Sequence, residues 1–345
     1  MYHTYLTILI PSIISLIITY FATKFVISYF YEAGIIAEDH NKEKPVLLPS
    51  SGGIAVAFGL IAGILTYTFG GSFIYAPILD IDKLLATALS IALIVFVGFL
   101  DDINVKAKPV KATGMQDIKK GLKQWQKPLL TILGAFPLMA INAGVSAIHI
   151  PFFGIVNFGI IYPLIIIPLA VIFVSNAFNL LGGFDGLQTG MGVVASLALL
   201  IYSLLYGTNI GILLSALLFS SLIIFYPFNM YRAKIIPGDS FTYGVGAALV
   251  AIMIMGDAEA FGIIIFIPWI IEFFLHLRGR FDTTDVGIRQ KDGTFKAPYG
   301  KKIYSLTHFV MNLRPMKEYE VSAYLILIEV IFVILAFGLK FLHLL

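Results

Sequence analysis

The chain has 345 residues, of which 59% are hydrophobic and 12% are charged, and its formal net charge at pH 7 is +3. A soluble globular domain is about one-quarter charged, so this composition excludes an ordinary water-soluble fold and indicates an integral membrane protein with several spans. Cysteine is absent, which excludes disulfide bonds and thiolate metal sites. Nothing in the composition or motifs points to a nucleic-acid partner.

Ten segments are long and apolar enough to cross a bilayer, which takes roughly 20 residues for each helix. The first lacks a basic start and is too long for a cleaved signal, so we interpret it as a span. Residues 1–345 are therefore predicted to form one all-α polytopic membrane domain, with nine or eleven spans as alternatives. The ten segments are 5–30, 52–70, 83–100, 128–147, 161–179, 187–206, 209–228, 240–256, 259–277 and 321–344.

Basic residues gather in the loops that follow odd-numbered spans. These loops hold 20 of the 23 lysines and arginines, whereas the loops after even-numbered spans hold none. Because positively charged loops stay in the cytoplasm, both termini are predicted to lie outside, and most of these cations are expected only to orient the protein and contact lipid head groups. The predicted cytosolic loops are 31–51, 101–127, 180–186, 229–239 and 278–320. Within the last, the sequence VGIRQKDGTFKAPYG predicts a short β-hairpin.

Two polar sets follow the third and fifth spans. Asp101 and Asp102 end the third span, where adjacent carboxylates repel each other and face an unfavourable helix dipole. They are either a solvated helix end, or a cation site or base for a phosphate substrate. In NAFNLLGGFDG, Asn176 and Asn179 share a helical face before a glycine pair and a turn at Asp185. Hydrogen bonding between helices is a rival explanation for Asn176 alone, but the whole cluster favours a ligand site.

Two further sets flank the eighth and ninth spans. Asp239 starts the eighth span, either as a helix cap or as a ligand-binding carboxylate. Arg278 and Arg280 follow the ninth span, and either flank the membrane or bind phosphate. Carboxylate and amide oxygens suit Mg²⁺ or Mn²⁺ rather than Zn²⁺, and the nearby cations suit a phosphate. The residues alone therefore indicate metal-dependent phosphoryl transfer at the lipid–water boundary, without a Walker motif.

These sets, in this order, resemble the polyprenyl-phosphate N-acetylhexosamine-1-phosphate transferase family, and most of all its eukaryotic and archaeal branch. The resemblance implies transfer of N-acetylglucosamine (GlcNAc) 1-phosphate from UDP-GlcNAc to a dolichyl or polyprenyl phosphate, with UMP released, on the cytoplasmic face of the cell membrane. This would be the first step of a lipid-linked glycan pathway such as protein N-glycosylation. The matching stretches are DHNKEKPVLLPSSGG, GFLDD, NAFNLLGGFDGL, GDSFTYGVGA and RGR.

The resemblance also implies residue roles. Asn179 and Asp239 would hold Mg²⁺, and Lys127 would bind the pyrophosphate, with Lys123 as an alternative. Asp101 and Asp102 would position the lipid phosphate, with base action or support of the metal left open. The implied substrate contacts are Arg280 for phosphates and sugar, with Arg278 as a further phosphate candidate, Asp185 for uracil, and the loop with Asp39, Asn41, Lys42 and Ser50 for the nucleoside. Asn176 and Gly186 are also expected to bind substrate.

Some expectations stay open at this point. Gly279 stands where the family branch often has a histidine, which leaves the sugar unsettled between GlcNAc and another UDP-amino sugar such as UDP-GalNAc. Only His276 replaces the histidine-rich stretch of the bacterial MurNAc-pentapeptide branch, which argues against that donor. A transporter of anionic lipids or phosphates is the rival from another class, although it would place polar groups near span centres. The oligomeric state, a homodimer included, is not settled.

Overall fold

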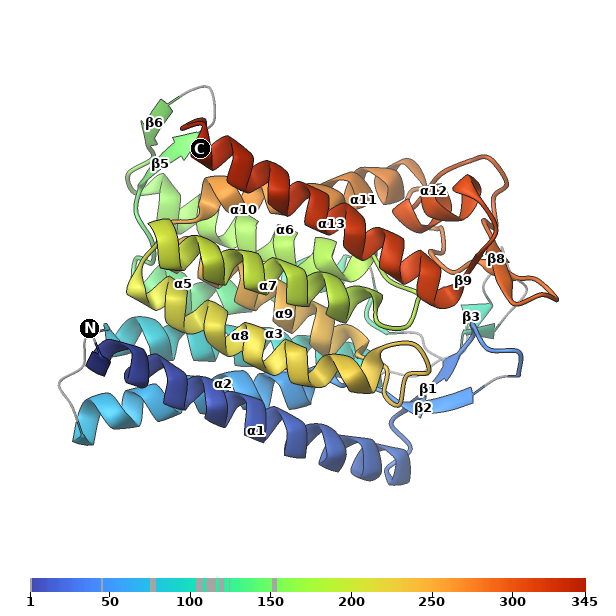
Figure 1. Cartoon of the computed structure of the whole chain (residues 1–345), viewed down its shortest axis with the longest axis horizontal. Helices are drawn as coiled ribbons and strands as arrows, with labels where there is room; N and C mark the ends of the chain where they lie inside the picture. Colours follow the sequence, from blue (N-terminus) through green and yellow to red (C-terminus); the bar gives the residue numbers. More distant parts are fainter. Residues whose placement is uncertain are drawn as a thin grey trace.

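The computed structural model describes residues 2–44, 46–74, 79–103, 108–109, 116–117, 121–123, 125–150 and 154–345. Within these ranges the chain forms a bundle of long, roughly parallel helices (Figure 1). Eight of them are long and apolar enough to span a membrane, which confirms the predicted all-α polytopic fold. They are α1 (Tyr2–Glu32), α2 (Gly53–Phe73), α3 (Ile81–Ile103), α6 (Ile167–Leu180) together with the π-helical turn before it (Tyr162–Ile166), α7 (Leu187–Tyr206), α8 (Asn209–Asn229), α9 (Gly238–Met255) and α13 (Glu318–Phe341).

Two of the ten predicted spans take a different form. The ninth is α10 (Glu259–Ile265) and α11 (Ile267–Arg278), which bend by 58° at Phe266. The fourth is a run of three short pieces, α4 (Gln126–Thr131), a 3₁₀ turn (Ile132–Gly134) and α5 (Ala135–Ala140). It ends well before residue 147, because Asn142 and Gly144 turn the backbone into the left-handed region. The described residues thus offer ten passes only if the bent pair and this short run are both counted.

Short hairpins cap the two ends of the bundle. The predicted hairpin in the last loop is confirmed: β7 (Ile288–Arg289) pairs antiparallel with β8 (Thr294–Lys296), which also pairs with β9 (Met316–Lys317). The other antiparallel pairs are β1 (Ile36–Asp39) with β2 (Val46–Pro49), β3 (Lys108–Pro109) with β4 (Gln116–Asp117), and β5 (Ala147–Ile150) with β6 (Gly154–Asn157). A short helix, α12 (Leu306–Leu313), lies beside the three-stranded sheet.

Both termini lie at one end of the bundle, together with β5 and β6 (Figure 1). The loops that follow α1, α6, α8 and α11 lie at the opposite end, which we call the loop end. This arrangement agrees with the predicted alternation of loops. It brings segments that are far apart in the sequence, including the four polar sets, to the same end of the molecule.

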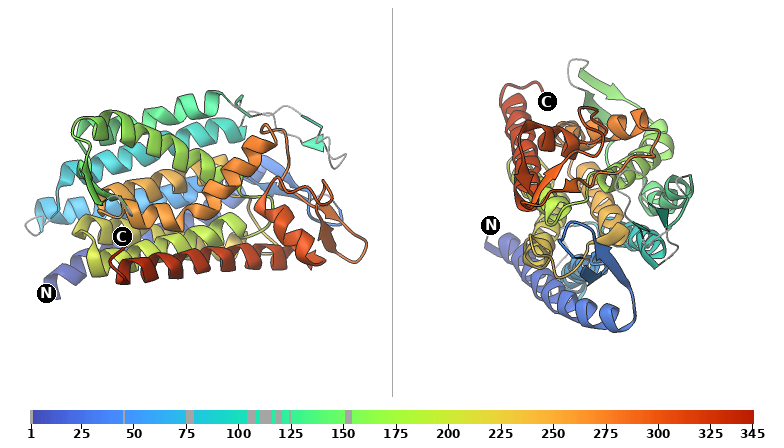
Figure 2. Two further views of the ribbon diagram at one scale, coloured as in Figure 1. Left: turned by 90° about the horizontal axis from the view of Figure 1, so that it is seen from above. Right: turned by 90° about the vertical axis from the view of Figure 1, so that its right-hand side faces the viewer.

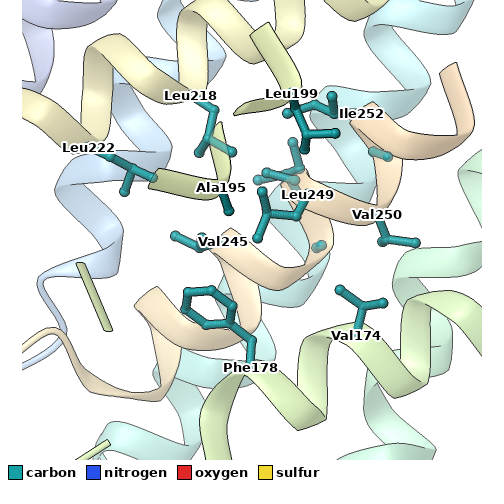
Figure 3. Packing of buried hydrophobic residues seen from close by; sticks show 14 of the residues in the cluster. Val174, Phe178, Ala195, Leu199, Leu218, Leu222, Val245, Leu249, Val250 and Ile252 are labelled. Carbon is teal, nitrogen blue, oxygen red and sulfur yellow. The ribbon is translucent and has the colours of Figure 1, made fainter. Parts of the chain in front are cut away.

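The centre of the bundle is α9, whose residues from Ser240 to Met255 are all buried. Its glycines and alanines let α3 and α6 approach closely, as small residues do in membrane helix pairs. Seen end-on, α9 is surrounded while α1 and α13 lie at the rim (Figure 2). Apolar side chains of α6, α7 and α8 converge on α9, as Figure 3 shows with Phe178, Leu199, Leu218 and Leu249. A rigid central helix therefore fixes the position of Asp239 at its first turn.

Candidate active site

A buried ion-pair cluster joins the end of α3 to the starts of α4 and α9. The Lys127 ammonium lies 2.8 Å from Asp101 Oδ2 and 3.4 Å from Asp239 Oδ2. Tyr243, one turn along α9, donates its hydroxyl to Asp101 Oδ2 at 3.4 Å, and the backbone N–H of Leu122 donates to Asp101 Oδ1. Because Asp101 is almost wholly buried, these contacts fix Lys127 in one place. Lys123, the alternative to Lys127, is exposed and lacks these contacts.

Asp102 caps the central helix. Its two carboxylate oxygens accept the backbone N–H groups of Asp239, at 2.7 Å, and Ser240, at 3.1 Å. A carboxylate at a helix N-terminus satisfies free N–H groups and complements the helix dipole. Gly238 makes the approach feasible: its φ is +75°, and a Cβ there would lie 2.7 Å from Asp102 Oδ1. The two adjacent aspartates therefore do different work, one on Lys127 and the other on the α9 backbone.

The two asparagines of α6 also have different hydrogen-bond partners. Asn179 Oδ1 accepts the Thr242 hydroxyl of α9 at 2.8 Å, one turn from Asp239. Asn176 donates its amide to the Thr131 hydroxyl at 2.9 Å and to its own helix at Ile172 O. Asn179 thus lies beside the α9 start, whereas Asn176 ties α6 to α4. The hydrogen bond between helices, weighed as the rival explanation for Asn176, is present.

The donor chemistry of this cluster suits a hard divalent cation. The set holds three carboxylates, those of Asp101, Asp102 and Asp239, and one ammonium, that of Lys127. Asp239 is the most exposed of the three carboxylates, and Asn179 supplies a neutral amide oxygen near it. Carboxylate and amide oxygens without a histidine or cysteine are the ligands that Mg²⁺ and Mn²⁺ favour.

A second charged cluster lies where the loop after α1 meets the loop after α6. The Lys42 ammonium contacts three carboxylates: Asp39 at 3.0 Å, Asp185 at 2.7 Å and Glu318 at 2.7 Å. Glu318 Oε1 also accepts the backbone N–H of Asp185 at 3.2 Å and the Asn41 amide at 3.3 Å. The start of α13 therefore holds the two loops together.

The charged groups of this second cluster shift one another's pKa values. Burial works against the Lys42 ammonium, but hydrogen bonds to Asp185 and Glu318 outweigh it and raise the pKa of Lys42 above its ordinary value. Burial raises the pKa of the Asp185 carboxyl, while the Lys42 hydrogen bond opposes that rise. One cation among three carboxylates leaves an excess of negative charge in a poorly hydrated place.

An open pocket of about 630 Å³ adjoins this cluster. Its floor comes from the broken stretch after α6, where Gly183 takes φ +87° and Phe184 packs edge-on against Phe295 of β8 with ring centroids 5.4 Å apart. Other wall residues come from β1, the segment before α9 and the loop after α11. The lining residues are Glu38, Asp39, His40, Asn41, Gly183, Phe184, Asp185, Gln188, Asn229, Ile236, Pro237 and Val286.

Four residues expected to bind substrate lie outside both clusters. Ser50 is buried, and its backbone N–H donates to Ile35 O at 3.0 Å. Gly186 starts α7 with φ +73°. Arg278 and Arg280 are exposed at the loop end; Arg278 covers the Tyr304 ring at 5.1 Å, and neither forms an ion pair within the described ranges. Beside them, a side chain on Gly279 would meet Thr283 Cγ2 at 2.7 Å, so Thr283 occupies the space that a larger residue would need.

Glu318 was missed from the sequence because it opens an apolar span, where an acidic residue looks like an ordinary helix start. A third acidic set was missed too: Glu272 and Asp285 contact His276, although only His276 drew notice from the sequence. Much of 101–127, including Lys106, Lys111, Lys119 and Lys120, lies outside the described residues.

Comparison with known proteins decides the family. The sequence model of glycosyl transferase family 4 matches residues 84–257, half of the chain, which contain both aspartate sets and NAFNLLGGFDG. A protein of Saccharolobus solfataricus is 36% identical over 334 residues, covering 96% of each chain. The chain belongs to glycosyl transferase family 4. The resemblance inferred from the sequence motifs is thereby confirmed.

The names of the relatives indicate the branch within family 4. The Saccharolobus protein bears the provisional name UDP-N-acetylglucosamine–dolichyl-phosphate N-acetylglucosaminephosphotransferase. A Dictyostelium discoideum protein with that enzyme name is 23% identical, over 86% of this chain and 78% of its own length. A phospho-N-acetylmuramoyl-pentapeptide-transferase of Limosilactobacillus fermentum is 35% identical, but over only 44% of this chain. Similarity to the dolichyl-phosphate branch therefore extends over more of the chain.

Proposed function

We propose that this family 4 protein transfers GlcNAc 1-phosphate from UDP-GlcNAc to a dolichyl or polyprenyl phosphate, which releases UMP and leaves a lipid-linked pyrophosphoryl sugar. The observation that carries the proposal is the Lys127 ammonium held between Asp101 and Asp239 at the start of a buried helix. Placed at the loop end, beside an acidic pocket, it offers a fixed positive charge to a pyrophosphate. Similarity to the archaeal relatives over 96% of the chain supports the same reaction.

The chain's residues act in this reaction by binding and alignment. An oxygen of the lipid phosphate attacks the β-phosphorus of the sugar nucleotide, the bond to the bridging oxygen breaks, and its electron pair leaves with UMP. The attacking phosphate is already anionic, so the barrier is charge repulsion, which a fixed cation lowers. Asp101 aims Lys127 and Asp102 holds the start of α9; every oxygen of both carboxylates accepts a hydrogen bond. Their contacts therefore favour positioning over base action.

We propose Mg²⁺, or Mn²⁺ in its place, as the cofactor. Asp239 and Asn179 would hold it, because they supply oxygen ligands within the cluster of carboxylates described above. When bound, the ion would neutralise phosphate charge and withdraw electron density from the leaving group.

The nucleoside end of the donor would enter the pocket near Asp185 and Asn41. Lys42 would contact it only by exchanging one of its three carboxylates for the ligand. Arg278 and Arg280 would reach the phosphates and sugar from the loop after α11, since they are exposed and lack ion-pair partners within the described ranges.

The lipid tail would lie in an apolar groove of about 1050 Å³ between α6, α9 and α10. Phe173, Val250, Met253 and Phe266 are among its lining side chains, and its polar feature is Glu259, whose carboxylate accepts the Tyr162 hydroxyl at 2.6 Å. We place the loop end in the cytosol, because the predicted odd-numbered loops carry 20 of the 23 basic residues.

The test is lipid-dependent UMP release by the purified protein in detergent. Dolichyl and undecaprenyl phosphate are offered with Mg²⁺, and UDP-GlcNAc, UDP-GalNAc and UDP-glucose are compared in parallel. We expect UMP with UDP-GlcNAc, lost on addition of EDTA and restored by excess Mg²⁺ or Mn²⁺. If only UDP-GalNAc gives UMP, the proposed sugar donor is wrong. If activity survives EDTA, the proposed metal requirement is wrong. Binding neither nucleotide sugar nor UDP would contradict the transferase and favour a transporter.

A further inference from the structure

A buried network of Glu272, His276 and Asp285 joins α11 to the loop that follows it. His276 Nε2 lies 3.0 Å from Glu272 Oε1, on its own helix, and 2.8 Å from Asp285 Oδ1, across the loop. Glu272 is fully buried and His276 nearly so. When this nitrogen carries a proton, it forms a charge-assisted hydrogen bond with Glu272 Oε1 and an ion pair with Asp285 Oδ1. The contact between His276 and Asp285 joins the two ends of the eight-residue segment 277–284, which carries Arg278 and Arg280.

The same network reaches α12. The second oxygen of Glu272 accepts the backbone N–H of Leu306 at 2.7 Å, and Thr307 donates its hydroxyl to Asp285 O at 2.8 Å. The N-terminus of α12 is thereby anchored to both α11 and the loop.

His308 adds a further fixed contact. Its Nδ1 accepts the Tyr304 backbone N–H at 3.1 Å, which leaves Nε2–H to donate to Thr284 O at 2.9 Å. Burial lowers the pKa of His308, which keeps the ring in the neutral form that this pattern requires. The loop is thus held at both Thr284 and Asp285.

The loop that this network closes has an unusual backbone. Arg280 and Phe281 both take a φ of 55°, in the left-handed region that non-glycine residues seldom adopt. Such conformations persist only where surrounding contacts enforce them, and they concentrate at functional sites. Phe281 supplies one such contact by packing on Phe273 of α11, with ring centroids 5.8 Å apart, and its N–H donates to His276 O at 2.9 Å.

The far side of the loop forms part of the nucleotide pocket. Val286 lines that pocket. A Cβ on Gly183 would lie 3.3 Å from Val286 Cγ2 and 3.5 Å from Asp285 Cβ, so this segment packs directly on the broken stretch after α6. Movement of Asp285 would therefore disturb both the pocket wall and the direction of the arginines.

We infer that Glu272, His276 and Asp285 form a clamp that positions the Arg280 loop and the Val286 wall for the sugar nucleotide, with His276 as its central positioning residue. The inference rests on the proposed function for the reaction that it serves. Since none of the three is expected to touch the substrate, their effect should pass through Arg280 and the Val286 wall. Asp285→Asn is the mildest break, because it keeps the backbone contacts to Thr307 and the packing on Gly183; His276→Gln is the second.

The experiment combines amide hydrogen exchange with kinetics on the full-length protein in detergent. We expect both variants to speed exchange in 279–286 by roughly tenfold and to raise the KM for UDP-GlcNAc by roughly tenfold, with the KM for dolichyl phosphate unchanged. In an Arg280→Ala background, either change should raise the KM by a clearly smaller factor than in the unaltered protein, because only the part carried by the Val286 wall remains. Glu329→Gln, a buried carboxylate change in α13 away from the loop, should alter none of these quantities.

Each outcome has a clear consequence. Faster exchange with an unchanged KM, or a raised KM with unchanged exchange, overturns the clamp, as does an effect on the KM that is undiminished in the Arg280→Ala background. If the unaltered protein turns over no sugar nucleotide, the reaction fails on its own account. Exchange together with the Kd for UDP then decides the clamp: faster exchange with weaker UDP binding in both variants supports it, and any other combination overturns it.

Discussion

Replacing Asp102 tests whether the second of the paired aspartates is structural. The Asp102 carboxylate accepts two backbone N–H groups at the first turn of α9, at 2.7 and 3.1 Å, in a buried position. A hydrogen bond to a charged group contributes about 1.5–3 kcal/mol, and a carboxylate at a helix start adds about 0.3–1 kcal/mol. Asp102→Ala removes both contacts and leaves the N–H groups buried without an acceptor, so we expect a loss of about 3–7 kcal/mol.

Asp102→Asn is the more discriminating change. The asparagine side chain has one acceptor oxygen, so one N–H group stays unsatisfied and the charge is lost, at a cost of about 2–3 kcal/mol. We expect a fall in the thermal midpoint in detergent on the order of 3–5 °C, with kcat largely retained well below that midpoint. Asp101→Asn is the matched control, since it disturbs Lys127 instead and should lower kcat more than the midpoint. An unchanged midpoint with kcat abolished in Asp102→Asn would refute the capping role.

Three further predictions concern Lys127, Lys42 and Glu329. Lys127→Ala should lower kcat/KM for UDP-GlcNAc by about 10²–10³-fold in UMP-release kinetics, with part of the activity kept in Lys127→Arg, because a fixed cation beside the pyrophosphate is lost; normal kinetics would remove Lys127 from the site. Lys42→Met leaves three carboxylates without their cation, so UDP binding measured by calorimetry should weaken more at pH 8 than at pH 5, where Asp185, with its raised pKa, takes up a proton more readily. The loss is the ratio of the Kd of the variant to that of the unaltered protein at the same pH, since UDP itself titrates in this range whereas Lys42, with its raised pKa, stays charged at both pH values; equal losses at the two pH values would argue against the shared charge. Glu329 is fully buried in α13, and neither of its carboxylate oxygens has a hydrogen-bond partner in the described structure. Glu329→Met should therefore raise the free energy of unfolding by about 1–3 kcal/mol, and with it the thermal midpoint. A lower midpoint would show that the carboxylate has a stabilising partner.

The sequence predicted the spans that are long and uniformly apolar, since each must satisfy its backbone internally and cover the bilayer thickness. It failed on the fourth, where the apolar run continues past the end of the helix. Hydropathy counts Ile141 and Ala143 as membrane residues, but Asn142 and Gly144 supply the left-handed turn that stops the helix at Ala140. Composition alone does not distinguish a short helical run followed by a turn from a full span.

The sequence predicted which residues belong to the site better than it predicted the contacts that they make. Polar groups at the ends of apolar helices are costly, so Asp101, Asn179, Asp185 and Asp239 stood out without a structure. The contacts of these residues could not be predicted, because the spacing of residues along one helix does not show which neighbouring helix they face. Only the packing shows that Asp102 turns to the α9 backbone while Asp101 turns to Lys127.

Glu318 illustrates the same limit from the opposite side. In the sequence it is one more acidic residue at the start of an apolar helix, where the helix dipole explains it adequately. In the structure it lies 2.7 Å from Lys42 and accepts the N–H of Asp185, so the last helix holds together two loops that line the proposed nucleotide pocket. The loops after the first and fifth predicted spans therefore meet the start of the last span at the Glu318 carboxylate. Loss of that carboxylate should loosen both loops at once, which no local reading of any single span would predict.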